Sequence, residues 1–423
     1  MRTYPLPVLL ALLLTGPLAS AQSKVKIKTK GGTPAKTAAA SAKPVAAVAR
    51  PWSQRMADSF MRLYPDSVPP ERNRAARWGY EHGLMLKALE RTWQRTGERK
   101  YLDYVVKTMD LSIGAEASIR YFKMEDYNLD NINAGRVLLT LYQQPQLPRR
   151  ELYRKAAETL HQQLQNQPHT SEGGYWHKKR YPNQMWLDGL YMAEPFSAEY
   201  ARLFNQPKDF DHIALQFALV EKHMVDPKTG LLYHGWDEAK TEKWANKETG
   251  LSPNFWSRGM GWYAMALVDV LDYFPKDHPQ RPQLIRNLQR LAPVLAKYQD
   301  PATGGWWQVT DQANRQGNYI ETSGTCMFVY ALQKGVRLGY LDKQYAAVAR
   351  KGYQGVLQKF VETQPDGAVA LNGTVSVGGL GGNPYRDGSY EYYLSEPIKQ
   401  NDFKGVGPFI MASIEMEMAA GKK

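Results

Sequence analysis

Helical segments in this chain are joined by alternately short and long connections, and this alternation limits the folds open to it. Apolar residues recur at helical spacing from about Trp52 onward and predict about twelve helices. The expected ranges are 53–64, 75–96, 101–113, 130–143, 149–166, 187–204, 209–225, 258–274, 281–299, 322–339, 342–361 and 405–420. Only in residues 368–377 do apolar and polar residues alternate as they do in a strand. Links within consecutive helix pairs are short, whereas links between pairs are long, reaching about 40 residues at 362–404.

Six helical hairpins that close into a ring, an all-α (α/α)6 barrel, fit this alternation. The long loops would then gather at one end of the ring, which we call the mouth, beside the N-termini of the inner helices. Free N–H groups and helix dipoles at these N-termini favour an anionic ligand, so we expect the active site there. A right-handed α-solenoid is the alternative, but the segments share no tight repeat of about 34 to 47 residues.

The first 51 residues differ in composition from the rest. Arg2, an apolar run over 8–14 and a small-residue site at 19–21 form the pattern of a signal peptide over 1–21. Residues 22–51 are rich in Lys, Ala and Pro and predict a disordered basic linker, which leaves 52–423 as the barrel domain. We therefore expect export to the bacterial periplasm or medium, without stable insertion into a membrane.

The net charge of +13 is concentrated at the front of the chain. Residues 1–55 contain nine Lys or Arg and no Asp or Glu, which leaves about +4 for the remainder. We therefore expect no nucleic-acid partner. The single cysteine, Cys326, excludes a disulfide within the chain and a Cys-rich metal site. The eight histidines show no metal-ligand spacing, so we expect neither a metal nor another cofactor.

Two aspartates stand at the starts of predicted inner helices. Asp188 lies in Trp-Leu-Asp-Gly-Leu-Tyr-Met, and Asp130 lies in Asn-Leu-Asp-Asn-Ile-Asn. Two carboxylates at one mouth suit acid–base chemistry on a sugar, because mutual repulsion and partial burial raise the pKa of one member of such a pair. The alternative is that each is a helix N-cap, a common role for Asp. The aromatic residues around Asp188 argue against a simple surface cap.

Two histidines lie in the long loops near these aspartates. His234, in His-Gly-Trp-Asp, is a candidate donor to a sugar hydroxyl or to a water. His177, eleven residues before Asp188, is a second candidate for the same role. A purely structural or surface role stays open for both.

A Trp-Ser-Arg-Gly-Met-Gly-Trp sequence opens another inner helix. We expect its Arg258 to point into the mouth, where a planar guanidinium suits a carboxylate ligand. The flanking Trp256 and Trp262 suit stacking on sugar rings. The alternative is that both rings are core packing around a close helix–helix contact at the two glycines.

Four ordered motifs give the chain a family resemblance. They are W-L-D-G-L-Y-M-A-E-P-F, H-G-W-D, W-S-R-G-x-G-W and the late G-G-L-G-G-x-P-Y-R-D-G-S-Y-E-Y-Y. Together they resemble the unsaturated rhamnogalacturonyl hydrolases of glycoside hydrolase family 105 over about 52–420. The related unsaturated glucuronyl hydrolases of family 88 share the barrel but match the first motif less well.

The resemblance implies an (α/α)6-barrel enzyme without a cofactor. Such an enzyme removes a 4,5-unsaturated galacturonic acid from the non-reducing end of pectin- or rhamnogalacturonan-derived oligosaccharides by hydrating the C4=C5 double bond. Its ligand would be an anionic oligosaccharide, and we expect a monomer or weak oligomer. Three alternatives stay open: an unsaturated glucuronyl hydrolase, another glycosidase, lyase or epimerase on this barrel, and a non-catalytic glycan-binding protein.

The resemblance also implies roles for individual residues. Asp188 matches the principal acid and base, and Asp130 matches a second carboxylate that tunes Asp188 and holds sugar hydroxyls. Substrate contacts are implied for His234, Arg258, Trp256, Trp262, His177 and Tyr80.

Overall fold

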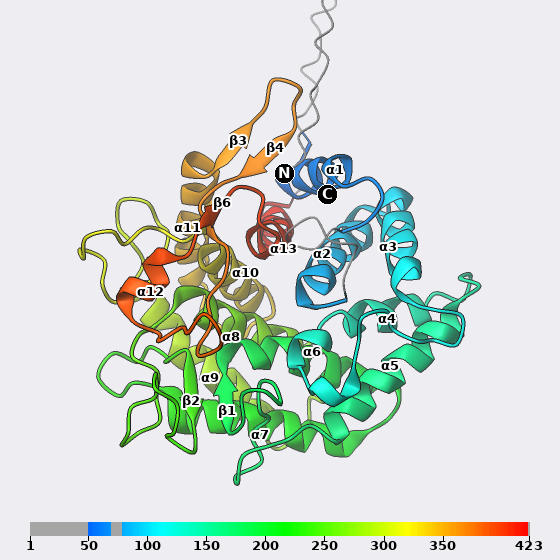
Figure 1. Cartoon of the computed structure of the whole chain (residues 1–423). Helices are drawn as coiled ribbons and strands as arrows, with labels where there is room; N and C mark the ends of the chain where they lie inside the picture. The colour runs from blue at the N-terminus through cyan, green and yellow to red at the C-terminus, as the bar shows by residue number, and fades with distance from the viewer. Residues whose placement is uncertain (1–49, 69–77, 422–423) are drawn as a thin grey trace, which may run out of the picture. The chain divides into compact units, whose positions relative to one another are not determined.

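An inner ring of helices organises the part of the chain that the structure describes. This computed structural model describes residues 50–68 and 78–421, which lie in one compact unit, Ala49–Lys423. Within these residues the ring consists of α2 (Tyr80–Thr96), α4 (Gly135–Tyr142), α6 (Leu187–Leu203), α8 (Ser257–Val270), α10 (Thr322–Arg337) and α13 (Phe403–Ala419). Each helix packs against the next, and α13 packs against α2, so the ring is closed (Figure 1). The predicted (α/α)6 barrel is confirmed, and the open solenoid is wrong.

An outer helix backs each inner helix. The outer helices that follow an inner helix directly are α3 (Arg99–Ser112), α5 (Arg150–Gln165), α7 (Pro207–Met224), α9 (Arg281–Lys297) and α11 (Tyr345–Lys359). The helix that backs α13 is instead α1 (Trp52–Leu63), from the other end of the domain. The Ser53 hydroxyl donates to Glu417 at 2.6 Å across this pair. The last helical hairpin is therefore assembled from both ends of the domain, and this contact closes the ring.

The helix boundaries differ from the prediction near Asp130. The segment expected at 130–143 begins as an α-helix only at Gly135, after the 3-10 turns η1 (Met124–Asp126) and η2 (Leu129–Asn131). The Asn128 side chain accepts a hydrogen bond from the Asp130 N–H, and such local bonds compete with regular helix. The expected start of the preceding helix, at 75, falls in 69–77, which lies outside the described residues; α2 is described from Tyr80.

Short antiparallel strands join the long loops. The pairs are β1 (Gln184–Trp186) with β2 (Gly235–Asp237), β3 (Val361–Thr363) with β4 (Val369–Leu371), and β5 (Thr374–Val375) with β6 (Ile398–Lys399). The first pair, with Met185 opposite Trp236, ties the loop before α6 to the loop before α8. A bridge between Trp256 and Val309 ties the next two loops in the same way. The predicted strand-like run 368–377 contains β4 and β5, and a short helix, α12 (Tyr390–Ser395), follows in the same long loop.

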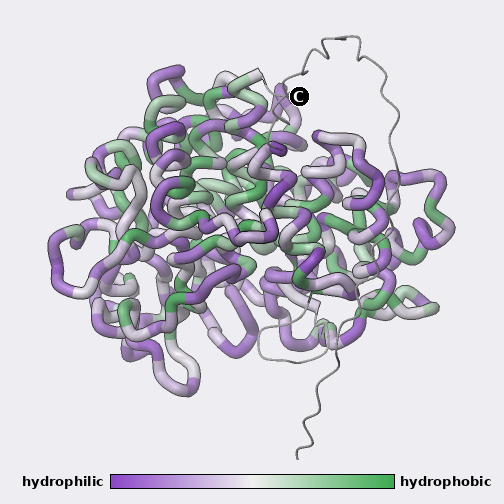
Figure 2. Tube along the Cα trace, turned by 90° about the horizontal axis from the view of Figure 1, so that it is seen from above, coloured by the Kyte–Doolittle hydropathy of each residue, from purple (hydrophilic) through white to green (hydrophobic). Residues whose placement is uncertain are grey.

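The interior contains charged residues as well as a large apolar core. Figure 2 shows apolar stretches among the packed helices and hydrophilic stretches on the outer loops. Near the C-terminal end of α8, buried Asp269 accepts hydrogen bonds from Tyr330, Lys334 and Arg136 at 2.6, 2.7 and 2.8 Å. These bonds and charges outweigh burial and hold the pKa of Asp269 well below its usual value. The network connects three inner helices at the end of the barrel opposite the mouth.

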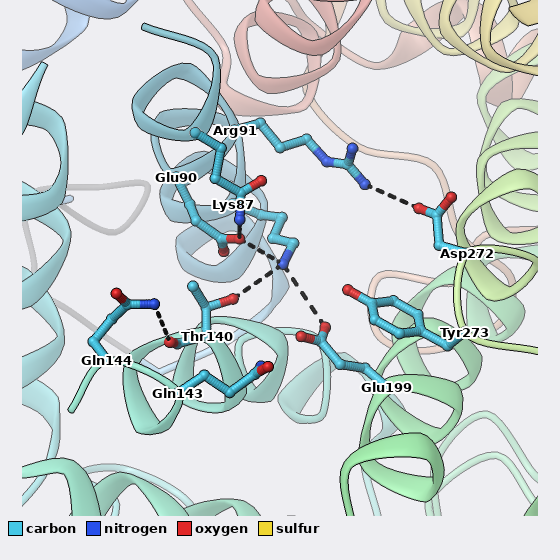
Figure 3. A pocket seen from close by; sticks show the side chains of 10 residues that line it. Lys87, Glu90, Arg91, Thr140, Gln143, Gln144, Glu199, Asp272 and Tyr273 are labelled. Carbon is cyan, nitrogen blue, oxygen red and sulfur yellow. Dashed lines mark hydrogen bonds and ion pairs between the residues drawn. The ribbon is translucent and has the colours of Figure 1, made fainter. Parts of the chain in front are cut away.

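A polar cavity of about 260 Å³ opens beside this network (Figure 3). Its wall includes Lys87, whose Nζ lies 3.0 Å from Glu90 Oε1 and 3.8 Å from Glu199 Oε2. Burial is the main cause that raises the pKa of Glu199. The wall is formed by residues near the C-terminal ends of α2, α4, α6 and α8, so the cavity is separate from the mouth.

The predicted front segments remain predictions. The signal peptide, 1–21, and the linker up to residue 49 lie outside the described residues. The linker was expected to run to residue 51, but Arg50 already pairs with Asp58 at 2.6 Å and with Glu98 at 2.7 Å. No helix within 50–68 and 78–421 has the length and apolar character needed to cross a bilayer.

Candidate active site

Asp188 lies in the first turn of α6 at the mouth. The N-cap position belongs to Trp186, and no side chain caps this helix, so the N-cap alternative for Asp188 is wrong. Asp188 Oδ2 lies 3.2 Å from His234 Nε2, while the side chain of Asp188 is only 13% exposed. The two atoms are not aligned as a hydrogen bond, and neither has another hydrogen-bond partner among the described residues. Both of these atoms are buried, so a ligand or a water at the mouth would meet the exposed part of the Asp188 side chain, with His234 behind it.

His234 is held from its other side. Its Nδ1 shares a hydrogen bond of 2.7 Å with the hydroxyl of Tyr393 in α12. Burial raises the pKa of that hydroxyl well above its usual value, so Tyr393 remains neutral. The long loop before α13 therefore orients an imidazole that belongs to the loop before α8.

Asp130 is bound by basic residues from the loop before α6. Its Oδ2 accepts a hydrogen bond from Lys178 Nζ at 2.5 Å, and its Oδ1 lies 3.4 Å from His177 Nε2. Burial acts to raise the pKa of Asp130, but the charge of Lys178 and its hydrogen bond outweigh burial, so the pKa lies below its usual value. Asp130 is therefore a carboxylate near neutral pH. It is not an N-cap either, because Asn128 caps its turn.

The Trp186 ring connects the two carboxylate sites. It stacks on His177 with centroids 4.6 Å apart and meets His234 edge-on at 5.5 Å. Burial lowers the pKa of His177 to about 4, although the charges of Asp130 and Asp188 act to raise it. This imidazole is therefore neutral near pH 7. The structure thus brings Asp130, Asp188, His177 and His234 to one mouth.

Arg258 supplies a buried cation at the start of α8. Its side chain is 1% exposed; Nη2 donates to the Val375 carbonyl and lies 3.9 Å from Glu321 Oε1. Its Nε and Nη1 have no hydrogen-bond partner among the described residues. The guanidinium also lies over the Trp256 ring, 5.2 Å from its centroid. Two donors on a fixed cation suit an anionic ligand.

The two tryptophans of the arginine motif are buried. Both are 1% exposed. The Trp256 indole N–H donates to Gln308 at 3.2 Å. Trp262 stacks on Tyr191 with centroids 4.9 Å apart and meets the ring of half-buried Tyr80 edge-on at 6.2 Å. These contacts are core packing, so sugar contacts by Trp256, Trp262 and Tyr80 stay predictions from the resemblance.

Sequence reasoning missed Lys178 and the role of Tyr393. The basic run 178–180 directly after His177 was a signal for the first, but spacing alone does not show which residue turns toward Asp130. Tyr393 lies 159 residues after its partner His234, so no local pattern links them. In the described ranges no group of three or more His, Cys, Asp and Glu side chains is arranged to hold a metal ion.

Known proteins resemble this chain over most of the barrel. The family model for Glycosyl Hydrolase Family 88 matches residues 52–420. A solved family 105 glycoside hydrolase from C. acetobutylicum ATCC 824 is 46% identical, with a TM-score of 0.83, over 87% of this chain and 100% of that one. Protein Atu3128 of Agrobacterium fabrum is 39% identical over 235 residues, which are 54% of this chain and 100% of that protein. The unsaturated rhamnogalacturonyl hydrolase YesR of Bacillus subtilis is 24% identical over 279 residues, 64% of this chain and 75% of that protein. This chain therefore belongs to the family 88 and 105 glycoside hydrolases.

Proposed function

We propose that this hydrolase removes a 4,5-unsaturated galacturonic acid from the non-reducing end of pectin- or rhamnogalacturonan-derived oligosaccharides. The likeness to the rhamnogalacturonyl hydrolase of Bacillus subtilis supports this substrate class. The observation that carries the chemistry is the contact of Asp188 with His234, at 3.2 Å, beside a second carboxylate held by Lys178. A buried guanidinium with unpaired donors adds a group for the uronate carboxylate.

The reaction begins with a proton. Asp188 donates it to C4 of the ring alkene, and positive charge develops at C5 and the ring oxygen. Water adds at C5 and passes a proton to the Asp188 carboxylate, which restores the acid. The hemiketal at C5 then opens, C1 is left as a hemiacetal, and its collapse to an aldehyde releases the remaining sugar as an alcohol.

Asp130 has a different role from Asp188, because it is ionised. A carboxylate stabilised by Lys178 does not donate a proton near neutrality, so Asp130 acts as an acceptor for sugar hydroxyls and as a negative charge near the developing cation. Arg258 holds the carboxylate on C5 through its free N–H groups. His234 contacts Asp188 and positions the water or a hydroxyl.

The test is loss of the ultraviolet absorbance of the conjugated alkene in pectin-lyase digests. We expect turnover of unsaturated galacturonyl–rhamnose and a loss of about 100- to 10,000-fold in Asp188→Asn, the usual range for removing a general acid. Undiminished activity in that variant would refute the mechanism. Cleavage of saturated oligosaccharides would instead favour an ordinary glycosidase, preference for unsaturated glucuronyl sugars would change the substrate, and binding without turnover would indicate a glycan-binding protein.

We also propose that the enzyme acts outside the cytoplasm. The signal-peptide pattern of residues 1–21 supports this location. Fractionation of the source bacterium with an antibody to the barrel tests it, and recovery of the full-length chain in the cytoplasm alone would contradict it.

A further inference from the structure

A small cavity lies behind the mouth, between α6 and the loop that carries His177. We propose that Glu194 of α6 acts through one buried water on Nδ1 of His177, and so fixes the imidazole that contacts Asp130. Glu194 is a positioning residue in this scheme, because it touches neither substrate nor reacting atoms. Its kinetic consequence rests on the proposed function, whereas the contact itself does not.

The two residues line the same cavity, and Glu194 also lines a larger cavity of about 270 Å³ on its other side. His177 and Glu194 both contribute to the wall of the small cavity, together with Gly189 and Trp186, and this cavity has a volume of about 10 Å³. That volume holds about one water molecule. His177 Nδ1 and Glu194 Oε2 are both buried, and neither has a hydrogen-bond partner among the described residues. Buried polar atoms are almost always paired, so a bridging water accounts for both.

Nδ1 of His177 faces α6. A Cβ placed on Gly189 would lie 3.3 Å from His177 Nδ1, so this atom points at the helix from which Glu194 projects. Glu194 follows Trp186 and Leu190 at a spacing of four residues on one face of α6, and all three line the cavity with His177. Since the two residues share this cavity but make no direct hydrogen bond, a water between them is the contact we propose.

The donors and acceptors agree along the chain of contacts. Asp130 is an acceptor, so the neutral His177 imidazole contacts it best with its proton on Nε2, which is 3.4 Å from Asp130 Oδ1. Nδ1 is then a bare acceptor and needs a donor. Burial, and then the charge of Asp209, raise the pKa of Glu194 well above its usual value, so its protonated carboxyl donates to the water. The water in turn donates to Nδ1, and every bond has one donor and one acceptor.

Two substitutions separate this scheme from simple packing. Glu194→Gln keeps a donor of the same size, and Glu194→Leu removes the donor at similar volume. In ¹⁵N-histidine NMR spectra we expect His177 to carry its proton on Nε2 in the wild type and in Glu194→Gln, and to lose that single tautomer in Glu194→Leu. The His177 signals are assigned by their loss in His177→Gln.

A second buried glutamate on α6 provides the matched control. Glu199 is 3% exposed and faces the cavity at the opposite end of the barrel. Glu199→Leu therefore removes a buried carboxyl from the same helix and should leave the His177 tautomer and its signals unchanged. An unchanged tautomer in Glu194→Leu, or an equal change in Glu199→Leu, would overturn the proposal.

Kinetics and crystallography complete the test. We expect kcat/KM on unsaturated disaccharides to fall about 3- to 10-fold in Glu194→Leu and to stay within about twofold of wild type in Glu194→Gln, as for one neutral hydrogen bond. A high-resolution structure of the wild-type protein should show a water within about 3.2 Å of both atoms, which does not depend on a variant folding. A structure without that water overturns the proposal. If the tautomer changes in Glu194→Leu but the wild type does not turn over these sugars, the contact stands and the proposed function fails.

Discussion

Replacing Lys178 with methionine removes the cation that holds Asp130, and it keeps most of the length and apolar stem of the side chain. The two side chains are 12% and 17% exposed, and their charged atoms lie 2.5 Å apart. In the variant, burial still opposes ionisation of Asp130, His177 is neutral near pH 7, and only the weaker effect of the Arg180 charge still favours the carboxylate. The pKa of Asp130 therefore rises. If ionised Asp130 supports the reaction, the variant should lose activity at a higher pH than the wild type as the solution is made acidic.

The size of the effect follows from the contact that is lost. A hydrogen bond to a charged group contributes about 1.5–3 kcal/mol, and little solvent screens this one. At 1.4 kcal/mol per factor of ten, we expect kcat/KM to fall about 10- to 150-fold near neutral pH. Because the native Asp130 has a lowered pKa, its ionisation stabilises the fold above the unfolded pKa of about 3.9, and this stabilisation is lost as the pH falls through the folded pKa. In the variant this stabilisation is smaller, because the folded pKa of Asp130 lies closer to or above the unfolded value.

The assay is the pH dependence of kcat/KM, followed by alkene absorbance. Lys179→Met is the matched control, because Lys179 is exposed and lies 5.7 Å from the Tyr127 ring rather than against Asp130. We expect the acidic limb to move to higher pH only in Lys178→Met. A wild-type profile in Lys178→Met, or the same displacement in Lys179→Met, would refute the role given to this ion pair.

Two further predictions concern the support of the site and of the barrel. Tyr393→Phe removes the 2.7 Å hydrogen bond to buried His234 and should lower kcat/KM about 3- to 10-fold, with a loss of about 1–3 kcal/mol in unfolding free energy; equal kinetics would show that the bond does not orient the imidazole. Asp269→Asn leaves buried cations unpaired and should cost about 3–5 kcal/mol in urea unfolding. Asp272→Asn, whose side chain is 29% exposed, should cost less than half as much. Since the pKa of Asp269 is lowered in the folded state, its stabilisation is present above about pH 4 and is lost as the pH falls through the folded pKa.

The helices were predictable because hydrophobic periodicity is local. Ranges such as 187–204 and 258–274 agree with α6 and α8 to within a few residues. The prediction failed at α4, where Asn128 bonds its own backbone and delays the helix. The pairing of α1 with α13 was not predictable from periodicity, because its partners lie at opposite ends of the domain.

The site was predictable in its residues but not in its electrostatics. Motifs placed Asp188 and Asp130 at the starts of inner elements, as the structure has them. The expectation that repulsion between two carboxylates governs their ionisation did not anticipate Lys178, which holds Asp130 as a carboxylate. The burial of Trp262 among Tyr191 and Tyr80 was equally invisible, since the same aromatic residue serves a core or a sugar platform.

By itself the sequence determined the helical class, the end of the barrel that carries the long loops, and the family. Each of these depends on patterns within a few tens of residues. Only the tertiary structure decided which charges meet: Lys178 with Asp130, Tyr393 with His234, and Glu194 with the cavity behind His177. Coulomb and hydrogen-bond energies depend on distances of a few ångströms and on exclusion of water, and ring closure sets both between residues that are far apart in the chain.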